Sequence, residues 1–495
     1  MDEVLRHNGS MGEVGGTDND FSGGTVHGPV VQAGTVNGGI HVNLPHDQSE
    51  SLLSTGRIVQ RLTNAHSDDA ATTLAKLDPD KAADVLALLP DAKQIEIVAC
   101  MDSKPVAAIL DRMPNKTSAR LRLAARGSTA LSRDAARWHR LLGDASGDFY
   151  RAGSSKRSSM GFASHYANGT VYWSERTGSG MVAGDIKKRY WKLGGFSGRL
   201  GYPIGSEKQA ATSTFGTSGT FQRFESTWDY PAEVIEKIGT VCGATIYASE
   251  KGAFATWGGI GEYYEASGGT WGPLGFPVSE EAQVPSTEGE TTELYRQEFE
   301  GGAVYWSWPA GAARVQPPIQ EHHESLARLT LPLGDQQPAT PSRLGTTGVF
   351  QNFQSYPLTG NLFFTIYSSG QRATWTVAGK IHGYYHLSGT TSGPFGFPRG
   401  NMFIKADNSP SAVKMQRFES GMIFSRLDLL DDAAIGLTGE AYELWLRYQS
   451  ELGYPTTPER PLGEGPDLIQ FFDNGVISVV DGTAQYWLSP GDASL

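Results

Sequence analysis

A tetrapeptide that combines a glycine, an aromatic residue and a proline recurs through the C-terminal two thirds of the chain. Its copies are Leu200-Gly201-Tyr202-Pro203, Leu274-Gly275-Phe276-Pro277, Phe395-Gly396-Phe397-Pro398 and Leu452-Gly453-Tyr454-Pro455. Proline fixes its own φ and biases the residue before it toward extended backbone, while glycine adopts φ values that other residues avoid. Each copy therefore predicts a sharp bend with an inward-pointing aromatic ring. The residues assigned structural roles are Gly201, Pro203, Gly275, Phe276, Pro277, Gly396, Pro398, Gly453 and Pro455.

An isoleucine and a tyrosine four residues apart precede three of these copies, and each tyrosine lies ten residues before its turn. The pairs are Ile186 with Tyr190, Ile260 with Tyr264, and Ile381 with Tyr385. This spacing is typical of a short helix with one buried face. Ile319 and His323 have the same spacing, and the same offset of ten residues from His323 reaches Leu333-Gly334. We therefore predict an eroded fifth turn at Leu333-Gly334, with His323 in the structural position of the tyrosine.

A second motif consists of an aromatic residue followed, usually three residues later, by glycine and an apolar stretch. It begins at Tyr166, Phe224, Phe299, Phe353, Phe418 and Phe472. Short apolar stretches between turn residues predict β-strands. Six strand elements thus alternate with five turns, and each repeated unit contains a short helix, a turn and strands.

Both motifs resemble the LGFP repeats of actinobacterial cell-envelope proteins, over residues 160–490. The resemblance implies a five-bladed β-propeller for residues 150–495, with six blades as the alternative. A ring agrees with a physical argument, because closure removes the exposed edges that short strands would otherwise leave.

Residues 51–142 have a different composition, rich in Ala, Leu, Asp and Lys, and their helix-start signals recur every 12 residues. These signals are Leu77-Asp78-Pro79, Leu89-Pro90-Asp91, Met101-Asp102-Ser103 and Met113-Pro114-Asn115. Pro and Asp favour the first turn of a helix. Helices this short cannot bury a face alone, so a small superhelix is predicted. Residues 70–125 resemble the cytosolic helical N-domain of MgtE-type magnesium channels, which implies an interaction module. The channel's other domains have no counterpart, so magnesium transport is not implied.

The N-terminal 45 residues contain a Gly/Val repeat after a predicted disordered leader at residues 1–20. Gly24-Thr25-Val26 is followed ten residues later by Gly34-Thr35-Val36, which predicts paired strands within residues 21–45. Two strands alone are marginally stable in water. We therefore expect residues 21–45 to pair with another chain and so form a homo-oligomer, or else to pack on a neighbouring domain. The whole chain is predicted to be a multidomain protein of the α and β class.

Composition excludes several classes of function. The formal net charge of −12 argues against nucleic-acid binding, which needs clustered basic residues. Cys100 and Cys242 are far apart and predict two buried thiols rather than a disulfide framework or a metal site. The sequence has no apolar run long enough for a signal peptide or a membrane span. The expected location is cytoplasmic, with the envelope reached only by a leaderless route.

No catalytic motif is found: GxSxG, the P-loop and HExxH are all absent from the sequence. We therefore predict no catalytic residues, metal or cofactor, and rank an enzyme as the third hypothesis. Trp191, Trp271, Trp308 and Trp375 fall outside the repeat pattern. Aromatic rings of this kind stack on ligands or anchor partners. These four are the tentative ligand-binding residues, and core packing is the alternative interpretation.

Two functional hypotheses follow. The resemblance implies a non-enzymatic protein whose propeller binds a cell-envelope glycan, with the N-terminal region mediating assembly. The alternative is an intracellular adaptor that holds protein partners through the helical module and the propeller. Binding to purified cell walls separates the two, because only the first predicts it.

Overall fold

The computed structural model describes residues 46–133, 135–146, 150–155, 160–226, 243–285, 293–308, 310–326, 330–355, 362–370, 373–405, 413–426 and 434–489. A helical N-terminal region is followed by antiparallel sheets, which confirms this part of the predicted fold class. The leader at residues 1–20, the Gly/Val repeat at residues 21–45 and Cys242 lie outside the described residues, so the expectations about them stay predictions. None of the helices in the described ranges is long and apolar enough to cross a membrane.

Seven helices precede the first described strand. They are α1 (His46–Asn64), α2 (Ser67–Ala75), α3 (Pro79–Leu88), α4 (Asp91–Cys100), α5 (Ser103–Leu110), α6 (Asn115–Arg133) and α7 (Ala135–Leu142). Helices α2 to α6 begin at residues 67, 79, 91, 103 and 115, which is the 12-residue spacing seen in the sequence. At the start of α3, Pro79 occupies the first turn and the Asp78 carboxylate accepts the Asp80 N–H at 3.2 Å. These are the N-terminal signals on which the prediction depended.

One buried apolar position recurs in every 12-residue unit of the helices. The residues at this position are Leu62, Leu74, Leu86, Val98 and Leu110, each at most 1% exposed. Each helix packs on the next but one, α1 on α3, α2 on α4, and α3 on α5, so the core is shared along the stack. The interpretation of Cys100 as a buried thiol is wrong, because the last turn of α4 leaves it on the surface.

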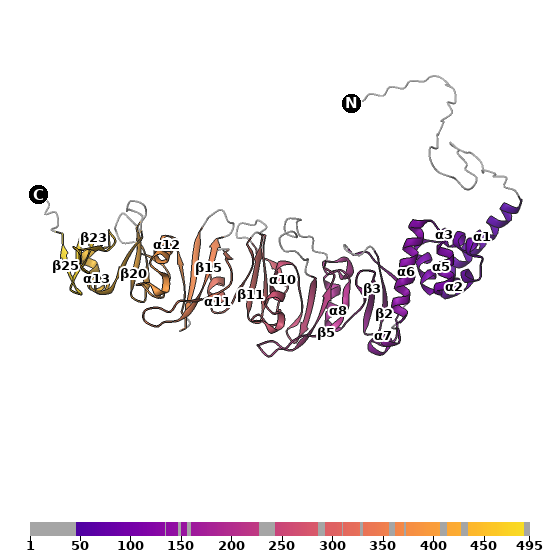
Figure 1. Ribbon diagram of the computed structural model, residues 1–495, viewed down its shortest axis with the longest axis horizontal. Coiled ribbons are helices and arrows are strands. Elements are labelled where there is room, and N and C mark those ends of the chain that lie inside the picture. The colour runs from indigo at the N-terminus through magenta and orange to yellow at the C-terminus, as the bar shows by residue number, and fades with distance from the viewer. Residues whose placement is uncertain are drawn as a thin grey trace, which may run out of the picture.

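Six antiparallel sheets follow, here numbered sheets 1 to 6 (Figure 1). Sheet 1 contains β1 (Tyr150–Gly153), β2 (Gly161–Tyr166), β3 (Gly169–Ser174) and β4 (Gly178–Ala183). Sheet 2 contains β5 (Pro203–Gln209), β6 (Gly219–Phe224), β7 (Ala244–Ser249) and β8 (Gly252–Thr256). Sheet 3 contains β9 (Ala282–Gln283), β10 (Leu294–Phe299), β11 (Gly302–Ser307) and β12 (Gly311–Val315).

Sheet 4 contains β13 (Thr330–Pro332), β14 (Gln337–Ala339), β15 (Gly348–Ser355), β16 (Phe363–Ser369) and β17 (Thr374–Ala378). Sheet 5 contains β18 (Phe403–Lys405), β19 (Val413–Phe418), β20 (Gly421–Arg426) and β21 (Ala434–Thr438). Sheet 6 contains β22 (Arg460–Pro461), β23 (Leu468–Phe472), β24 (Gly475–Val480) and β25 (Thr483–Leu488). The six aromatic residues of the second sequence motif lie in the central hairpins of these sheets.

A short helix follows each of the first five sheets. These helices are α8 (Gly184–Lys192), α10 (Gly258–Ala266), α11 (Ile319–Glu324), α12 (Gly379–Leu387) and α13 (Gly439–Leu452). Short 3-10 turns come after three of them: η1 (Gly195–Ser197), η2 (Gly269–Trp271) and η4 (Thr390–Ser392). Helix α8 contacts β4 of sheet 1 and β7 and β8 of sheet 2, and α12 contacts sheets 4 and 5 in the same way. The helices thus fill the space between successive sheets.

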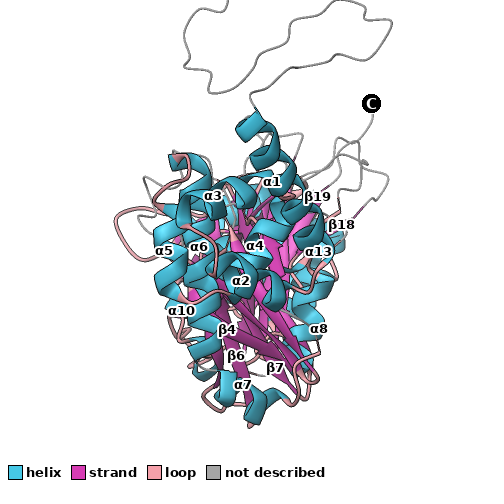
Figure 2. Ribbon diagram, turned by 90° about the vertical axis from the view of Figure 1, so that its right-hand side faces the viewer, coloured by secondary structure: helices cyan, strands magenta, loops and turns pink. Residues whose placement is uncertain are grey.

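The sheets follow one another in a row, so the predicted closed propeller is not confirmed. Sheet 1 and sheet 6 lie toward opposite ends of the molecule in Figure 1, with the helical region beyond sheet 1. Figure 2, seen from the helical end, shows helices α1 to α6 in front of the strands. A row and a ring bury the same faces between neighbouring units. The repeat pattern therefore predicts the contacts and leaves the rotation from one unit to the next undetermined.

An edge-to-face pair of aromatic rings joins each sheet to the helix that follows it. The pairs are Tyr172 with Tyr190, Tyr247 with Tyr264, Tyr305 with His323, Tyr367 with Tyr385, and Phe424 with Trp445, with interplanar angles of 72°, 87°, 89°, 82° and 83°. Edge-to-face geometry suits the opposite charges at the face and the edge of aromatic rings. The recurring tyrosine of the sequence pattern is thus a residue of the interface between units.

The turn Leu274-Gly275-Phe276-Pro277 is held by the two units that it joins. Gly275 has φ +66°, and a Cβ there would collide with the Glu300 carboxylate. Glu300 accepts the Phe276 N–H at 2.8 Å, and the Tyr264 hydroxyl donates to the Gly275 carbonyl at 2.6 Å. The other three turns repeat this geometry. Gly201, Gly396 and Gly453 have φ of 68°, 72° and 74°, and Pro203, Pro398 and Pro455 pair with the aromatic residue of the next strand.

A buried glutamine in each of sheets 2 to 6 binds the sheet before it, a feature that the sequence analysis did not identify. The five are Gln222, Gln297, Gln351, Gln416 and Gln470. Each side-chain amide donates to a carbonyl of the last strand of the preceding sheet and to a carbonyl near the start of its own sheet, over 2.8 to 3.1 Å. The signal is visible as Gln-x-Phe at the end of a strand. Sheet 1, the first sheet among the described residues, carries Ser164 at this position.

The eroded fifth turn is not at Leu333-Gly334, so that prediction is wrong. Pro332 pairs with Phe353 as Pro277 pairs with Phe299, which places Leu331 at the position of Phe276. The expected offset of ten residues fails at α11, which has six residues, whereas α8, α10 and α12 have nine each. Leu331 lies 22 residues before Phe353, as Tyr202 lies 22 residues before Phe224. The pairing of the proline with the aromatic residue of the next strand therefore identifies this turn where the spacing to the helix does not.

Helix α6 covers the outer face of sheet 1 and links the two regions. It contacts β2, β3 and β4, and Phe162 and Trp173 of sheet 1 belong to the same hydrophobic cluster as the helical core. At Gly127 the approach is close, since a Cβ there would lie 2.7 Å from the Phe162 ring and 2.9 Å from the Trp173 ring. The first sheet of the row is thus capped by a helix.

Candidate functional site

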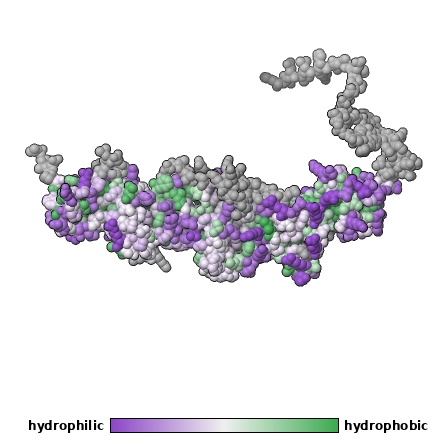
Figure 3. Space-filling model, viewed as in Figure 1, coloured by the Kyte–Doolittle hydropathy of each residue, from purple (hydrophilic) through white to green (hydrophobic). Residues whose placement is uncertain are grey.

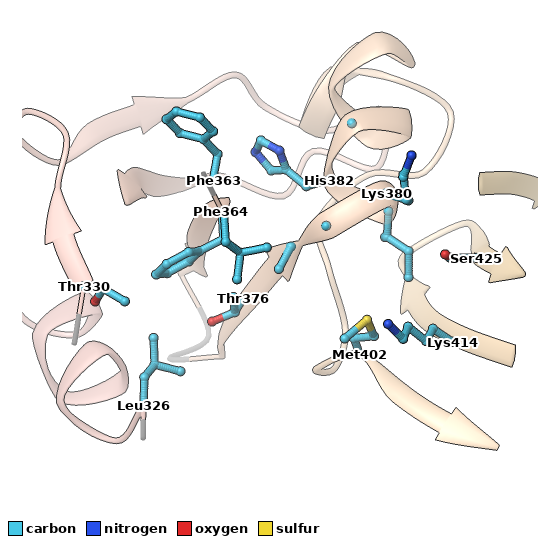
Figure 4. Close-up of a pocket in the computed structure, with 15 residues that line it drawn as sticks. Leu326, Thr330, Phe363, Phe364, Thr376, Lys380, His382, Met402, Lys414 and Ser425 are labelled. Atoms are coloured by element: carbon cyan, nitrogen blue, oxygen red, sulfur yellow. The ribbon is translucent and has the colours of Figure 1, made fainter. Parts of the chain in front are cut away.

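A cavity of 830 Å³ opens between sheets 4 and 5, beside the first turn of α12 (Figure 4). Fifteen residues line it: Leu326, Thr330, Leu362, Phe363, Phe364, Thr376, Ala378, Gly379, Lys380, Ile381, His382, Gly383, Met402, Lys414 and Ser425. We call it the α12 cavity. Its residues come from both sheets and from the helix between them, so the repeat interface itself forms the site.

The wall of the α12 cavity is mainly apolar and includes an exposed aromatic ring. Phe363, the first residue of β16, is 49% exposed, whereas its neighbour Phe364 is buried and stacks on Phe353 with ring centres 5.4 Å apart. Met402 is also exposed. Figure 3 shows hydrophobic residues gathered on the visible face in the region of β15 and α12. The cavity therefore offers a flat aromatic surface to a ligand.

All titratable side chains among the described lining residues are basic: Lys380, Lys414 and His382. His382 contacts the Thr365 hydroxyl through Nε2 at 2.9 Å, and burial, with a smaller effect of His386, lowers its pKa. His382 is therefore neutral near pH 7, and the two lysines carry the positive charge. The N-terminus of α12 adds a partial positive charge. The cavity is a local basic site in a chain whose formal net charge is −12.

A second cavity, of 760 Å³, lies next to the first along β17. It is lined by Trp375, by His322 on α11 and by the Pro317-Pro318 pair, among others. His322 Nε2 contacts the Thr376 hydroxyl at 2.9 Å, and Thr376 lines the α12 cavity. The two cavities therefore meet at the His322–Thr376 contact. Of the four predicted ligand-binding tryptophans, Trp375 is the one at this site.

The other three tryptophans lie in different units and form no common site with it. Trp191 is on the last turn of α8, where its ring contacts Tyr172 and Tyr190, and Trp308 follows β11. Trp271 is in η2 and is 70% exposed. The sequence analysis did not identify Phe363, Lys380, His382 or Lys414.

Several acidic side chains of the chain that would suit catalysis instead form contacts between repeat units. Glu280 pairs with Arg189 at 3.1 Å, and Asp335 accepts the Tyr263 hydroxyl at 2.6 Å. Burial raises the pKa of Glu281 to about 7, and this carboxyl accepts the Trp257 ring N–H at 3.0 Å. Over the described ranges, His, Cys, Asp and Glu form no group of three that would suit a metal ion.

His323 is a buried residue of the interface between sheets 3 and 4. Its ring lies between Tyr305 and Phe353, Nε2 contacts the Thr330 hydroxyl at 2.6 Å, and burial lowers its pKa to about 4. The unfolded chain binds a proton near the ordinary value of 6.5. Folding stability should therefore fall as the pH drops from about 6.5 to about 4, by up to about 3 kcal/mol from this residue.

His323→Phe should remove this pH dependence, because phenylalanine has no proton to bind. Urea titrations of both proteins at pH 4 and pH 7 measure it as the difference between their free energies of unfolding. If the free energies of unfolding of the two proteins changed by the same amount between pH 7 and pH 4, His323 would be solvated in the folded state.

The architecture defines the class of this protein: a row of repeated antiparallel sheet units behind a small helical stack. Residues 154–198 and 274–327 match the LGFP repeat, and residues 55–103 match the FliG middle domain. The first match agrees with the resemblance noted in the sequence. The second falls on the helices for which the sequence indicated a resemblance to MgtE.

No curated protein matches the chain. Among solved structures, the extracellular domain of the one-component system BT4673 from B. thetaiotaomicron aligns at 8% identity over 70% of this chain and 49% of that protein, with a TM-score of 0.10. PorZ, a surface component of the type-IX secretion system of Porphyromonas gingivalis, aligns at 8% identity over 70% and 54%, with a TM-score of 0.11. The chain thus spans about half the length of each, and scores this low define neither fold nor function.

Proposed function

We propose that this chain is a non-enzymatic binding protein that holds an anionic cell-envelope glycan in the α12 cavity. The observation that carries the proposal is the pairing of an exposed aromatic ring, Phe363, with two lysines in a cavity whose described lining residues include no carboxylate. Aromatic and apolar walls with a few placed polar groups are typical of ligand sites. A glycan with carboxylate or phosphate groups matches both parts of the cavity.

Both lysines stand where the equivalent repeats carry uncharged or acidic residues. Lys380 is the second residue of its helix, and the corresponding residues are Asp185, Gly259 and Glu440. Lys414 lies four residues before Phe418, and the corresponding residues of the other sheets are Phe162, Thr220, Tyr295, Val349 and Leu468. A lysine at a helix N-terminus is unfavourable for the helix. Residues that break a local rule in this way are expected at functional or strained sites.

The uncharged groups of the cavity suit a sugar ring. Phe363 offers its face, and Trp375 lies in the adjoining cavity across the His322–Thr376 contact. The hydroxyls of Thr330, Thr376 and Ser425 line the same space and can donate and accept hydrogen bonds. Sugars present apolar C–H faces and hydroxyl edges, so one ring can use both kinds of surface.

An adaptor that holds protein partners is the second candidate, and the shape of the molecule favours it. The helical region and sheet 6 lie at opposite ends of the row (Figure 1), so partners bound to each would be held apart. This function needs no contact with the cell envelope. Wall binding by the purified protein distinguishes it from the first.

The double variant Lys380→Gln/Lys414→Gln should bind purified bacterial cell walls at least about 100-fold more weakly than the parent, because it removes two charge-assisted hydrogen bonds that contribute about 1.5 to 3 kcal/mol each. Cosedimentation measures the affinity. A soluble acidic polysaccharide should compete with the walls, whereas a neutral polysaccharide of similar length should not, and added salt should weaken binding.

Trp271→Ala is the matched control, because this exposed ring lies outside both cavities. It should leave wall binding and the melting temperature unchanged. A parent protein that does not cosediment with walls would reject the glycan proposal in favour of the adaptor. Loss of binding in Trp271→Ala, with the lysine variant unaffected, would move the site to η2.

A further inference from the structure

The outward face of sheet 6 carries a row of three apolar side chains on adjacent strands. Phe471 of β23 lies opposite Val476 of β24, and Val476 lies opposite Trp487 of β25. Phe471 and Trp487 are 44% and 52% exposed. The inward face of the same sheet packs on α13, where the Tyr448 and Tyr486 rings lie 4.5 Å apart. β25 is the last described element of the chain.

In sheets 1 to 5 the equivalent face is buried by the following unit. The residues that correspond to Trp487 are Val182, Thr256, Val315, Val377 and Leu437, all at most 1% exposed. Those that correspond to Phe471 are His165, Arg223, Glu298, Asn352 and Arg417. In sheet 6, Trp487 thus stands where the other sheets have a smaller side chain, and Phe471 stands where they have a polar one.

The face of sheet 6 does not suit another unit of the same kind. Ser478 replaces the aromatic residue that pairs edge-to-face with the next helix, as Tyr305 does with His323. Trp487 would occupy the space that the next unit fills around Val315 or Val377. Protruding aromatic rings on a surface with few charges are instead typical of the centre of a protein–protein interface.

We infer that sheet 6 is a dimer interface on which a second copy of this chain places the same face. A twofold axis that lies between the two faces, parallel to the strands and over Val476, sets Phe471 of each copy over Trp487 of the other. This is the self-complementarity that an isologous interface requires. Ser478, which is small and buried, adds no protruding side chain to this face. Among the outward-facing strand positions described in this sheet, Arg460 is the one charged residue. It lies on the edge strand β22, so in the dimer it is far from Arg460 of the second copy. No like charges meet.

The size of the face sets the strength of the dimer. Strands β22 to β25 have 2, 5, 6 and 6 residues, and with a spacing of about 4.8 Å and a rise of about 3.3 Å per residue they cover about 300 Å² per copy. Standard protein–protein interfaces bury about 800 Å² per partner. The dimer is therefore expected to be weak and reversible.

Sedimentation equilibrium of the full chain tests this inference with substitutions that the fold already tolerates. Phe471→Arg introduces the residue found at this position in sheets 2 and 5, and Trp487→Val introduces the residue of sheets 1, 3 and 4. The parent should shift from monomer to dimer with rising concentration. The double variant should remain monomeric, with its dissociation constant raised at least about 100-fold and its melting temperature unchanged. Trp271→Val, which changes an exposed tryptophan elsewhere, should dimerise like the parent.

Three results would overturn the inference. A parent that remains monomeric to about 1 mM excludes the dimer. A parent whose association survives in the double variant dimerises through another surface, such as residues 21–45. If dimerisation appears only after residues 490–495 are removed, this segment covers the face in the intact chain.

Discussion

Phe276→Ala is expected to destabilise the sheet units by about 3 to 5 kcal/mol, the usual cost of deleting a buried aromatic side chain. Phe276 is 0% exposed, and its ring lies 6.4 Å from that of Tyr247 in the preceding unit. The two anchors of its backbone, Glu300 and Tyr264, would stay in place and prevent the turn from collapsing into the cavity. Denaturant titration of parent and variant measures the loss as a lower unfolding midpoint.

Phe403→Ala provides the comparison, because Phe403 on β18 is exposed. It should change the free energy of unfolding by less than about 1 kcal/mol. Equal midpoints for Phe276→Ala and the parent would mean that Phe276 is solvated and that the turn does not hold neighbouring units together.

Gln297→Leu should cost about 2 to 4 kcal/mol, because it leaves two buried carbonyls without a partner. The Gln297 side-chain amide donates to the carbonyls of Ala255 and Ser279, both at 2.9 Å, and the residue is fully buried. Leucine is close in volume, so the measured loss reports the hydrogen bonds rather than a cavity. The readout is again the free energy of unfolding.

Gln449→Leu tests whether glutamine-to-leucine exchange is itself harmful. Gln449 on α13 is exposed and donates to a carbonyl of its own helix, so little change is expected. If Gln297→Leu were as stable as the parent, the amide bonds between sheets would contribute nothing, and ring packing alone would hold the units together.

Local spacing predicted the elements of this fold but not the way they are assembled. The 12-residue period of the helices and the turns at Gly275 and Gly396 depend on residues near one another in sequence, and the structure has them where expected. Whether the sheets close into a ring depends on a small rotation at each interface, which many side chains set together. No single motif encodes that rotation.

The candidate site was hidden for a related reason. Lys380 and Lys414 are 34 residues apart and belong to different elements, so only the stacking of sheets 4 and 5 brings them to one cavity. Aromatic content pointed to tryptophans, and one of them, Trp375, lies beside the site. Comparison of each repeat position by position would have shown both lysines as departures from the pattern.

An open row makes every interface a point through which mechanical load must pass, whereas a ring would share the load between two paths. The interface between sheets 3 and 4 lacks two of the recurring anchors. Thr330 replaces the turn glycine, and Gln354 stands where Glu300 accepts a backbone N–H in the unit before. Tension along the chain should therefore separate the molecule there first, which would leave α11 and the His322–Thr376 contact at the break. The cavity beside Trp375 would open with it, so stretching the rod would disrupt this part of the candidate site while the other units stay folded.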